Sequence, residues 1–112
     1  MDIIVTTGFE VDGYRIVRYL GVVRGLTVRS TNILQLIFSG FRSIFGGRIK
    51  AMIRLCDASR QDAFDQMTEH ARALGANAVV GMSYDSEGVS GGWAEIMAYG
   101  TAVMIEPSGS RA

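Results

Sequence analysis

Two side chains in this sequence, Cys56 and His70, could coordinate a soft or borderline metal ion, because thiolate and imidazole are the ligands that zinc and heavier ions prefer. They lie 14 residues apart in a segment with helical periodicity. A rise of 1.5 Å per residue would separate them by about 21 Å, whereas bonds from zinc to its ligands are only about 2.0–2.3 Å long. We therefore expect a core cysteine and a flanking helix histidine. The alternative is a metal site built across subunits from several copies of Cys56 or His70.

Two further features could bind a small anion. Gly46, Gly47 and Arg48 stand where the same helix should begin, so backbone N–H groups and one positive charge could face a phosphate or carboxylate. The spacing is not that of a phosphate-binding loop, and glycines that permit a tight entry turn are the plainer explanation.

Arg60 is the second feature, and it falls about 20° from the centre of the apolar stripe of this helix. It predicts either a buried or inter-subunit ion pair, for instance with Glu95, or an anion-binding pocket.

Catalytic groups are not indicated. The single histidine lies on the predicted core helix, and no serine is framed by the Gly-x-Ser-x-Gly pattern of a nucleophile elbow. The helix carboxylates Asp62, Asp65 and Glu69 fall on the side opposite the apolar stripe, as solvated charges do. An enzyme with an inter-subunit site therefore ranks last among the possible functions.

The helix that carries these candidates is predicted over residues 49–74. Its apolar side chains lie within about 60° of one direction when residues are spaced 100° apart. They are Met52, Ile53, Cys56, Ala63, Phe64, Met67, Ala71 and Leu74. Gly75 follows as the expected left-handed terminator.

Four strands are predicted around this helix. They are residues 3–7, 14–29, 77–84 and 93–105, with a turn at Asp12-Gly13 and a polar loop over 85–92. Gly21 and Gly25 are expected to mark bulges or bends. The last strand has small residues on one face, where a helix can pack closely, and large ones on the other, which need cover from another subunit or layer. Residues 32–45 are expected to form a short helix and a loop.

Composition limits the protein class. Eleven basic and eleven acidic side chains balance, which argues against nucleic acid as a general partner. Residues 1–56 carry a net charge of +5 and residues 57–112 carry a net charge of −5, so subunit surfaces could be complementary.

The location of the protein is also indicated by the sequence. A single cysteine fits a reducing compartment. The longest apolar segment, 93–105, is shorter than the ~20 residues that a spanning helix needs. We expect a cytoplasmic protein with no transmembrane segment, whose single domain covers residues 1–106 before a tail at 107–112.

Several motifs, in this order, resemble the YbjQ-like family across residues 3–105. They are Gly21-Val22-Val23-Arg24-Gly25, Ser30-Thr31-Asn32-Ile33, Gly40-Phe41-Arg42, Gly46-Gly47-Arg48, the run from Ala71 to Gly81, and Tyr99-Gly100-Thr101-Ala102-Val103. The resemblance implies an α+β fold, a small antiparallel sheet with one long packed helix, that assembles into a ring-shaped homopentamer. It also implies possible heavy-metal binding.

This chain departs from the family at two points. Met52 and Ile53 stand where many members have a Tyr-Glu pair, and Cys56 stands where leucine is usual. A ligand site that needs the Tyr-Glu pair would therefore be lost here, and the thiol is not part of a family motif.

From these features we expect a non-enzymatic homo-oligomer that binds a metal ion or a small anionic ligand at subunit interfaces. The alternative is a structural or interaction protein whose ring presents a surface to a protein or membrane partner. The segment that contains Phe38, Phe41 and Phe45 would supply that surface.

Overall fold

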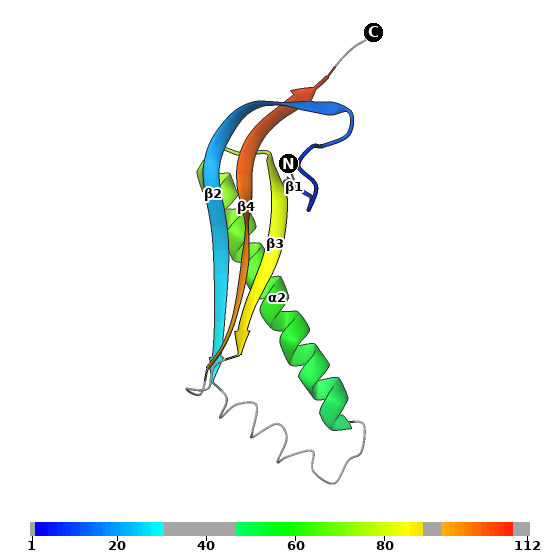
Figure 1. Ribbon diagram of the computed structural model, residues 1–112, viewed down its shortest axis with the longest axis vertical. Coiled ribbons are helices and arrows are strands. Elements are labelled where there is room, and N and C mark those ends of the chain that lie inside the picture. The colour runs from blue at the N-terminus through cyan, green and yellow to red at the C-terminus, as the bar shows by residue number, and fades with distance from the viewer. Residues whose placement is uncertain (1, 31–46, 89–92, 109–112) are drawn as a thin grey trace.

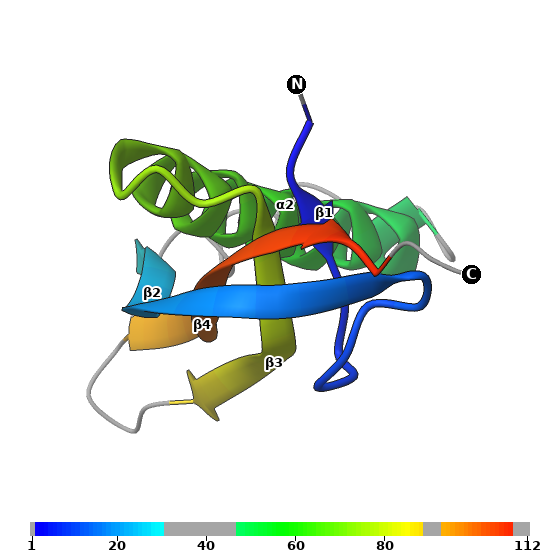
Figure 2. The same cartoon turned by 90° about the horizontal axis from the view of Figure 1, so that it is seen from above.

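The computed structural model describes residues 2–30, 47–88 and 93–108. In this part of the chain the elements are β1 (Ile4–Val5), β2 (Tyr14–Ser30), α2 (Gly47–Ala73), β3 (Ala78–Gly88) and β4 (Trp93–Pro107). The strands form one sheet in the order β1-β3-β4-β2, and α2 covers one face of it (Figure 2). The α+β class expected from the sequence is confirmed.

The sheet is mixed, which corrects the expectation of a purely antiparallel one. β2 with β4 and β3 with β4 are antiparallel pairs, but β1 runs parallel to β3, with Ile4 opposite Ala78 and Val5 opposite Val79. The reason is the segment 6–13, which leads from β1 at one edge of the sheet to β2 at the other edge. Because this segment does not close a hairpin, it does not force an antiparallel pairing on β1.

The predicted helix and its terminator are confirmed, but its buried face is rotated. Ala63, Met67 and Ala71 are buried as expected, and Ser59 and Thr68 join them. Ile53 and Leu74, predicted on the apolar side, are instead exposed. The end of α2 is a Schellman motif, in which the Ala76 N–H donates to the Ala71 carbonyl and the Gly75 N–H to the Arg72 carbonyl. Gly75 has φ +86°, as this motif requires.

Small residues on the sheet set how closely α2 approaches. Ala98, Gly100 and Ala102 of β4 are buried on the helix side, together with Val23 of β2, so the predicted small face of the last strand is confirmed. Gly25 lies in regular pairing with Ala98 and forms no bulge, contrary to expectation. A Cβ at Gly25 would collide with the Ala63 carbonyl oxygen and lie 2.7 Å from the Met67 nitrogen. The glycine is required by helix contact rather than by strand bending.

The bulges of β2 and the end of β3 agree only in part with the sequence prediction. The register of β2 shifts between Ile16 and Arg18 and again between Tyr19 and Gly21. The bulge predicted at Gly21 is therefore confirmed, and its φ is +125°. β3 continues to Gly88, so the loop predicted over 85–92 begins too early. Pairing of Asp85 with Met97 overrides the turn-forming composition of that stretch.

The described chain is elongated and leaves one sheet face open. Its extents are 63 × 26 × 21 Å and its radius of gyration is 18.0 Å, whereas a compact domain of this length has about 13 Å. From its C-terminal end beside β2, α2 runs away from the sheet (Figure 1). On the opposite face, a small core of Ala78, Val80, Val103 and Ile105 is partly covered by Val11 and Ile16. Farther along β2, Val22, Leu26 and Val28 are exposed.

Candidate functional site

The structure keeps the two predicted metal ligands apart. Cys56 and His70 both lie on the continuous helix α2, which separates them by about 21 Å. Cys56 is a half-buried free thiol rather than the core residue expected. Within the described residues no group of three His, Cys, Asp or Glu side chains could hold a metal ion. The described residues of one chain therefore do not assemble a cluster of metal ligands around Cys56 or His70.

His70 instead attaches the helix to the edge of the sheet. Its Nδ1 accepts a hydrogen bond from the Arg24 N–H at 3.4 Å. Gln66, one turn earlier, accepts the Leu26 N–H through Oε1 at 3.1 Å, and the buried Thr27 hydroxyl donates to the Ser59 carbonyl at 3.0 Å. The first two of these contacts satisfy N–H groups of β2 that point away from β4. Sequence reasoning missed this role, because nothing in the periodicity of α2 shows which strand amides it faces.

Arg60 is exposed, so the expected burial within the apolar stripe is wrong for the single chain. The reason is the rotation of α2 toward Ser59 and Ala63, which the close approach at Gly25 permits. Its charge acts on Tyr84 of β3. Partial burial raises the pKa of the Tyr84 phenol, Arg60 opposes this rise, and the Asp57 and Asp65 carboxylates add to it. Arg60 thus belongs to a polar surface group between α2 and β3, and an anion pocket around it stays a prediction.

The other predicted anion site is only partly described. Gly47 and Arg48 open α2, and the first turn carries no acidic residue. Gly46 lies outside the described residues, as do the side chains of Arg48 and Met52. The segment with Phe38, Phe41 and Phe45 also lies outside them. The anion site at this helix start therefore stays a prediction.

Two sheet edges have no further strand beside them in the described chain. β2 is one edge strand, although its Arg24 and Leu26 N–H groups already donate to His70 and Gln66 of α2. On the other edge, β1 and the residues after it bond only to the first part of β3, where the Met82 N–H donates to the Thr6 carbonyl and the Gly81 N–H to the Gly8 carbonyl. The stretch Ser83–Gly88 pairs with β4 on one side and has no strand beside it on the other within the described residues. Such edges are templates for pairing with another chain.

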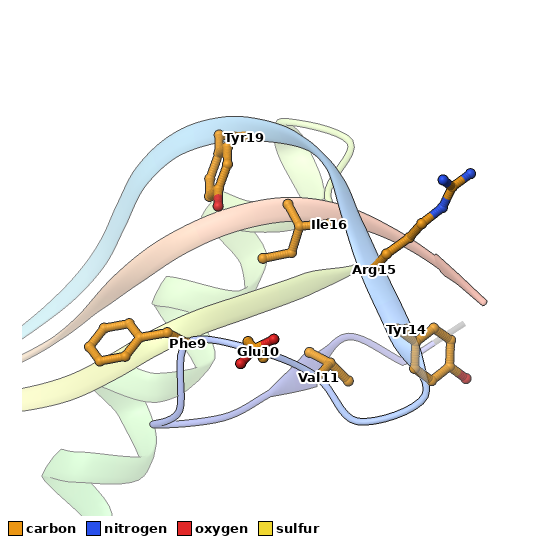
Figure 3. A pocket seen from close by; sticks show the side chains of 7 residues that line it. All are labelled: Phe9, Glu10, Val11, Tyr14, Arg15, Ile16 and Tyr19. Carbon is orange, nitrogen blue, oxygen red and sulfur yellow. The ribbon is translucent and has the colours of Figure 1, made fainter. Parts of the chain in front are cut away.

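A cavity that the sequence did not indicate lies at the other end of the molecule (Figure 3). It opens between the loop that carries Phe9, Glu10 and Val11 and the curved start of β2. The only sequence signal near it is the Asp12-Gly13 turn, where Gly13 has φ +81°. That signal places a turn but does not predict a cavity.

In the part of the chain that the structure describes, no helix has a stretch that is both long and apolar enough to cross a membrane. The exposed surface of α2 carries charged residues such as Arg54, Asp57 and Glu69.

Comparisons with known proteins agree with this architecture. The model of the YbjQ family, described as putative heavy-metal-binding, matches residues 3–106. A UPF0145 protein of Chromobacterium violaceum is 49% identical over 107 residues, covering 96% of this chain and 92% of the relative. A UPF0145 protein of Solibacter usitatus is 46% identical over 104 residues, covering 93% of each.

One solved structure shares the fold. It is a protein of unknown function from Pediococcus pentosaceus ATCC 25745, assigned to the DUF74 family. The TM-score is 0.59 at 19% identity, and the alignment covers 93% of this chain and 98% of that one. At this identity the likeness concerns the fold alone.

Proposed function

The chain belongs to the YbjQ family, and from this premise we propose that it works as a non-enzymatic homo-oligomer, a pentameric ring that binds a small ligand at its subunit interfaces. The observation that carries the proposal is the pair of strand edges with no described strand beside them, β2 and the Ser83–Gly88 stretch of β3, next to an exposed apolar sheet face. The Arg24 and Leu26 N–H groups of β2 already donate to α2, so pairing with another subunit would use the other backbone groups of this edge.

The two edges differ, which favours a ring. When edge β2 of one subunit meets edge β3 of the next, the contact is heterologous, and such contacts close into a ring or continue as a filament. The charges are complementary, since β2 carries Arg18 and Arg24 while the open part of β3 carries Asp85. Opposite charges on facing strands stabilise pairing.

The exposed apolar face supports the same assembly. Val22 is 69% exposed, Leu26 43% and Val28 42%. Burial of apolar surface contributes about 25 cal/mol per Å², and a neighbouring subunit that covers these side chains would supply it.

The ligand would lie between chains. No described residue cluster of one chain could hold a metal ion, so we place a heavy-metal ion between chains, at copies of Cys56 or His70 that the ring symmetry brings together. A small anion would instead use Arg60, or the start of α2 at Gly46, Gly47 and Arg48. Both versions require the assembled ring.

Charge reversal tests the assembly. We expect Arg24→Glu to shift the protein toward monomers in sedimentation velocity, because it places two like charges opposite each other on paired edges. Asp85→Arg should do the same, and the double variant should restore the assembly. Asp12→Lys, in the 6–13 loop, is the control and should leave it unchanged. If Arg24→Glu and Asp85→Arg both sediment like the wild type, the proposed edge contact is wrong.

A further inference from the structure

The cavity beside the 6–13 loop has a volume of about 290 Å³, at the small end of the range for ligand pockets. It is lined by Phe9, Glu10, Val11, Tyr14, Arg15, Ile16 and Tyr19. Val11 and Ile16 also pack against the buried cluster of Ala78, Val80, Val103 and Ile105. The cavity therefore has an apolar floor on the sheet face opposite α2, and it takes aromatic walls from the rest of its lining.

A β-bulge brings one of those walls into place. Ile16 and Tyr19 are three positions apart, so a regular strand would direct them to opposite faces. The register shift between Ile16 and Arg18 leaves Ile16 opposite Ile105 and Tyr19 opposite Val103, which share one face of β4. Both side chains therefore project from the arch of β2 toward the loop (Figure 3). Bulges of this kind often re-aim a side chain next to a functional site.

The loop that supplies the other wall is held along its length. The Thr6 N–H donates to the Val79 carbonyl at 3.0 Å and the Gly81 N–H to the Gly8 carbonyl at 2.8 Å. The far end is closed by the Tyr14 N–H to the Val11 carbonyl and the Ser108 N–H to the Gly13 carbonyl. The Phe9 ring rests on Gly81, where a Cβ would lie 3.0 Å from ring atom Cε1. Phe9 is nonetheless 79% exposed and Tyr19 69%, so two positioned rings face the solvent.

The charge at the cavity is negative. Arg15, the cation of the lining, forms an ion pair with Glu106 and points away from the other lining residues in Figure 3. Arg18 lies on the opposite face of the sheet, because its partner Met104 alternates with Val103 and Ile105. Glu10 makes no ion pair with any residue that the structure describes. Its carboxylate therefore lies in the lining, on the loop between Phe9 and Val11, without an ion-pair partner among the described residues (Figure 3).

We propose that this cavity binds a small organic cation, an alkylammonium or quaternary ammonium group, with Phe9 and Tyr19 as aromatic walls and Glu10 as the opposing charge. Ring faces attract such cations, and the attraction strengthens where water is excluded. The apolar floor formed by Val11 and Ile16 suits the alkyl substituents of the ligand. This site is independent of the proposed interface ligand, because it is built within one chain.

Choline and its uncharged isostere 3,3-dimethylbutan-1-ol are the probes that test the site. We expect choline to shift the aromatic NMR signals of Phe9 and Tyr19 saturably in the full-length protein. The isostere should bind at least about tenfold more weakly, since it lacks the charge that the rings and carboxylate attract. Equal affinity for the two probes, or no saturable shift, would overturn the proposal.

Matched variants separate the contributions. Glu10→Gln keeps the shape and removes the charge, and should weaken choline binding by about five- to tenfold. Phe9→Leu and Tyr19→Leu should each weaken it to a similar degree, while Tyr84→Leu, an exposed aromatic residue on the other sheet face, should not. If Glu10→Gln binds choline as the wild type does, the assignment is wrong. The assignment is also wrong if the Tyr19 signals shift when the protein is diluted but not when choline is added. That result would mean that a basic side chain of another copy fills the cavity.

Discussion

Gly25 of β2 lies directly beneath Ala63 of α2, so closely that a Cβ on the glycine would collide with the Ala63 carbonyl oxygen. This contact determines how the helix sits on the sheet. It brings the backbone of α2 onto β2, where Gln66 and His70 accept the amide hydrogens of Leu26 and Arg24. It also rotates the helix so that Ser59 is buried and Arg60 exposed.

Gly25→Ala should therefore destabilise the protein. The added methyl group would lie 2.6 Å from the Gln66 Cβ and 2.7 Å from the Met67 nitrogen, so the helix backbone must move. We expect the free energy of unfolding to fall by about 1–3 kcal/mol, the usual cost of overpacking, as measured by urea denaturation. Gly8→Ala is the matched control, because its Cβ would meet nothing closer than 3.5 Å. Equal stability of the two variants would contradict the close contact.

Asn77 connects the end of the helix to the last strand through its side chain. Its Nδ2 donates to the Ile105 carbonyl at 2.9 Å, and its Oδ1 accepts the Ile105 N–H at 2.8 Å. Asn77→Ala would leave both half-buried backbone groups without this partner. We expect the free energy of unfolding to fall by about 1–3 kcal/mol. Gln61→Ala, which removes an exposed amide bonded to Asp65, should change it by less than about 0.5 kcal/mol.

Tyr84 should ionise at a higher pH than a free tyrosine phenol on alkaline titration. Burial raises the pKa of its phenol from the ordinary 10.0, and Arg60 moderates that rise. A raised pKa in the folded state means that this contribution to stability is complete below pH ~10 and is lost as the pH rises through the folded-state pKa. Tyrosinate absorbance, assigned with Tyr84→Phe, measures it. Arg60→Gln should raise the pKa further, and Asp57→Asn should lower it. The opposite shifts would mean that Arg60 does not lie beside Tyr84.

Metal binding at an interface predicts a specific dependence on oligomeric state. If copies of Cys56 or His70 hold a heavy-metal ion, Cys56→Ala or His70→Ala should abolish binding of added Zn²⁺ or Cd²⁺ in isothermal titration calorimetry. Monomeric Arg24→Glu should bind none either, because one described chain lacks a metal cluster. Metal binding that survives both Cys56→Ala and His70→Ala would exclude these residues as ligands. His70→Gln, which keeps an acceptor for the Arg24 N–H, separates loss of the ligand from loss of the contact in His70→Ala.

The helix and its end were predictable because periodicity and Gly75 report local backbone preferences. The rotation of the helix was not, since it depends on a close approach between Gly25 and Ala63 that are far apart in sequence. The register of β2 was likewise hidden. No glycine or turn residue marks the shift between Ile16 and Arg18, so the alternation of a regular strand would place Tyr19 on the face opposite Ile16, and the cavity they share could not be inferred. The length of β3 depended on its partner strand, which pairs Asp85 with Met97 despite an unfavourable composition.

The central claim is that the chain assembles through its unpartnered edges into a ring, and native mass spectrometry tests it most directly. Protein purified without added metal or chelator should give a dominant species of five times the 12.1 kDa chain mass, with any bound ligand visible as a stoichiometric addition. A dominant monomer of the wild-type protein would contradict the account.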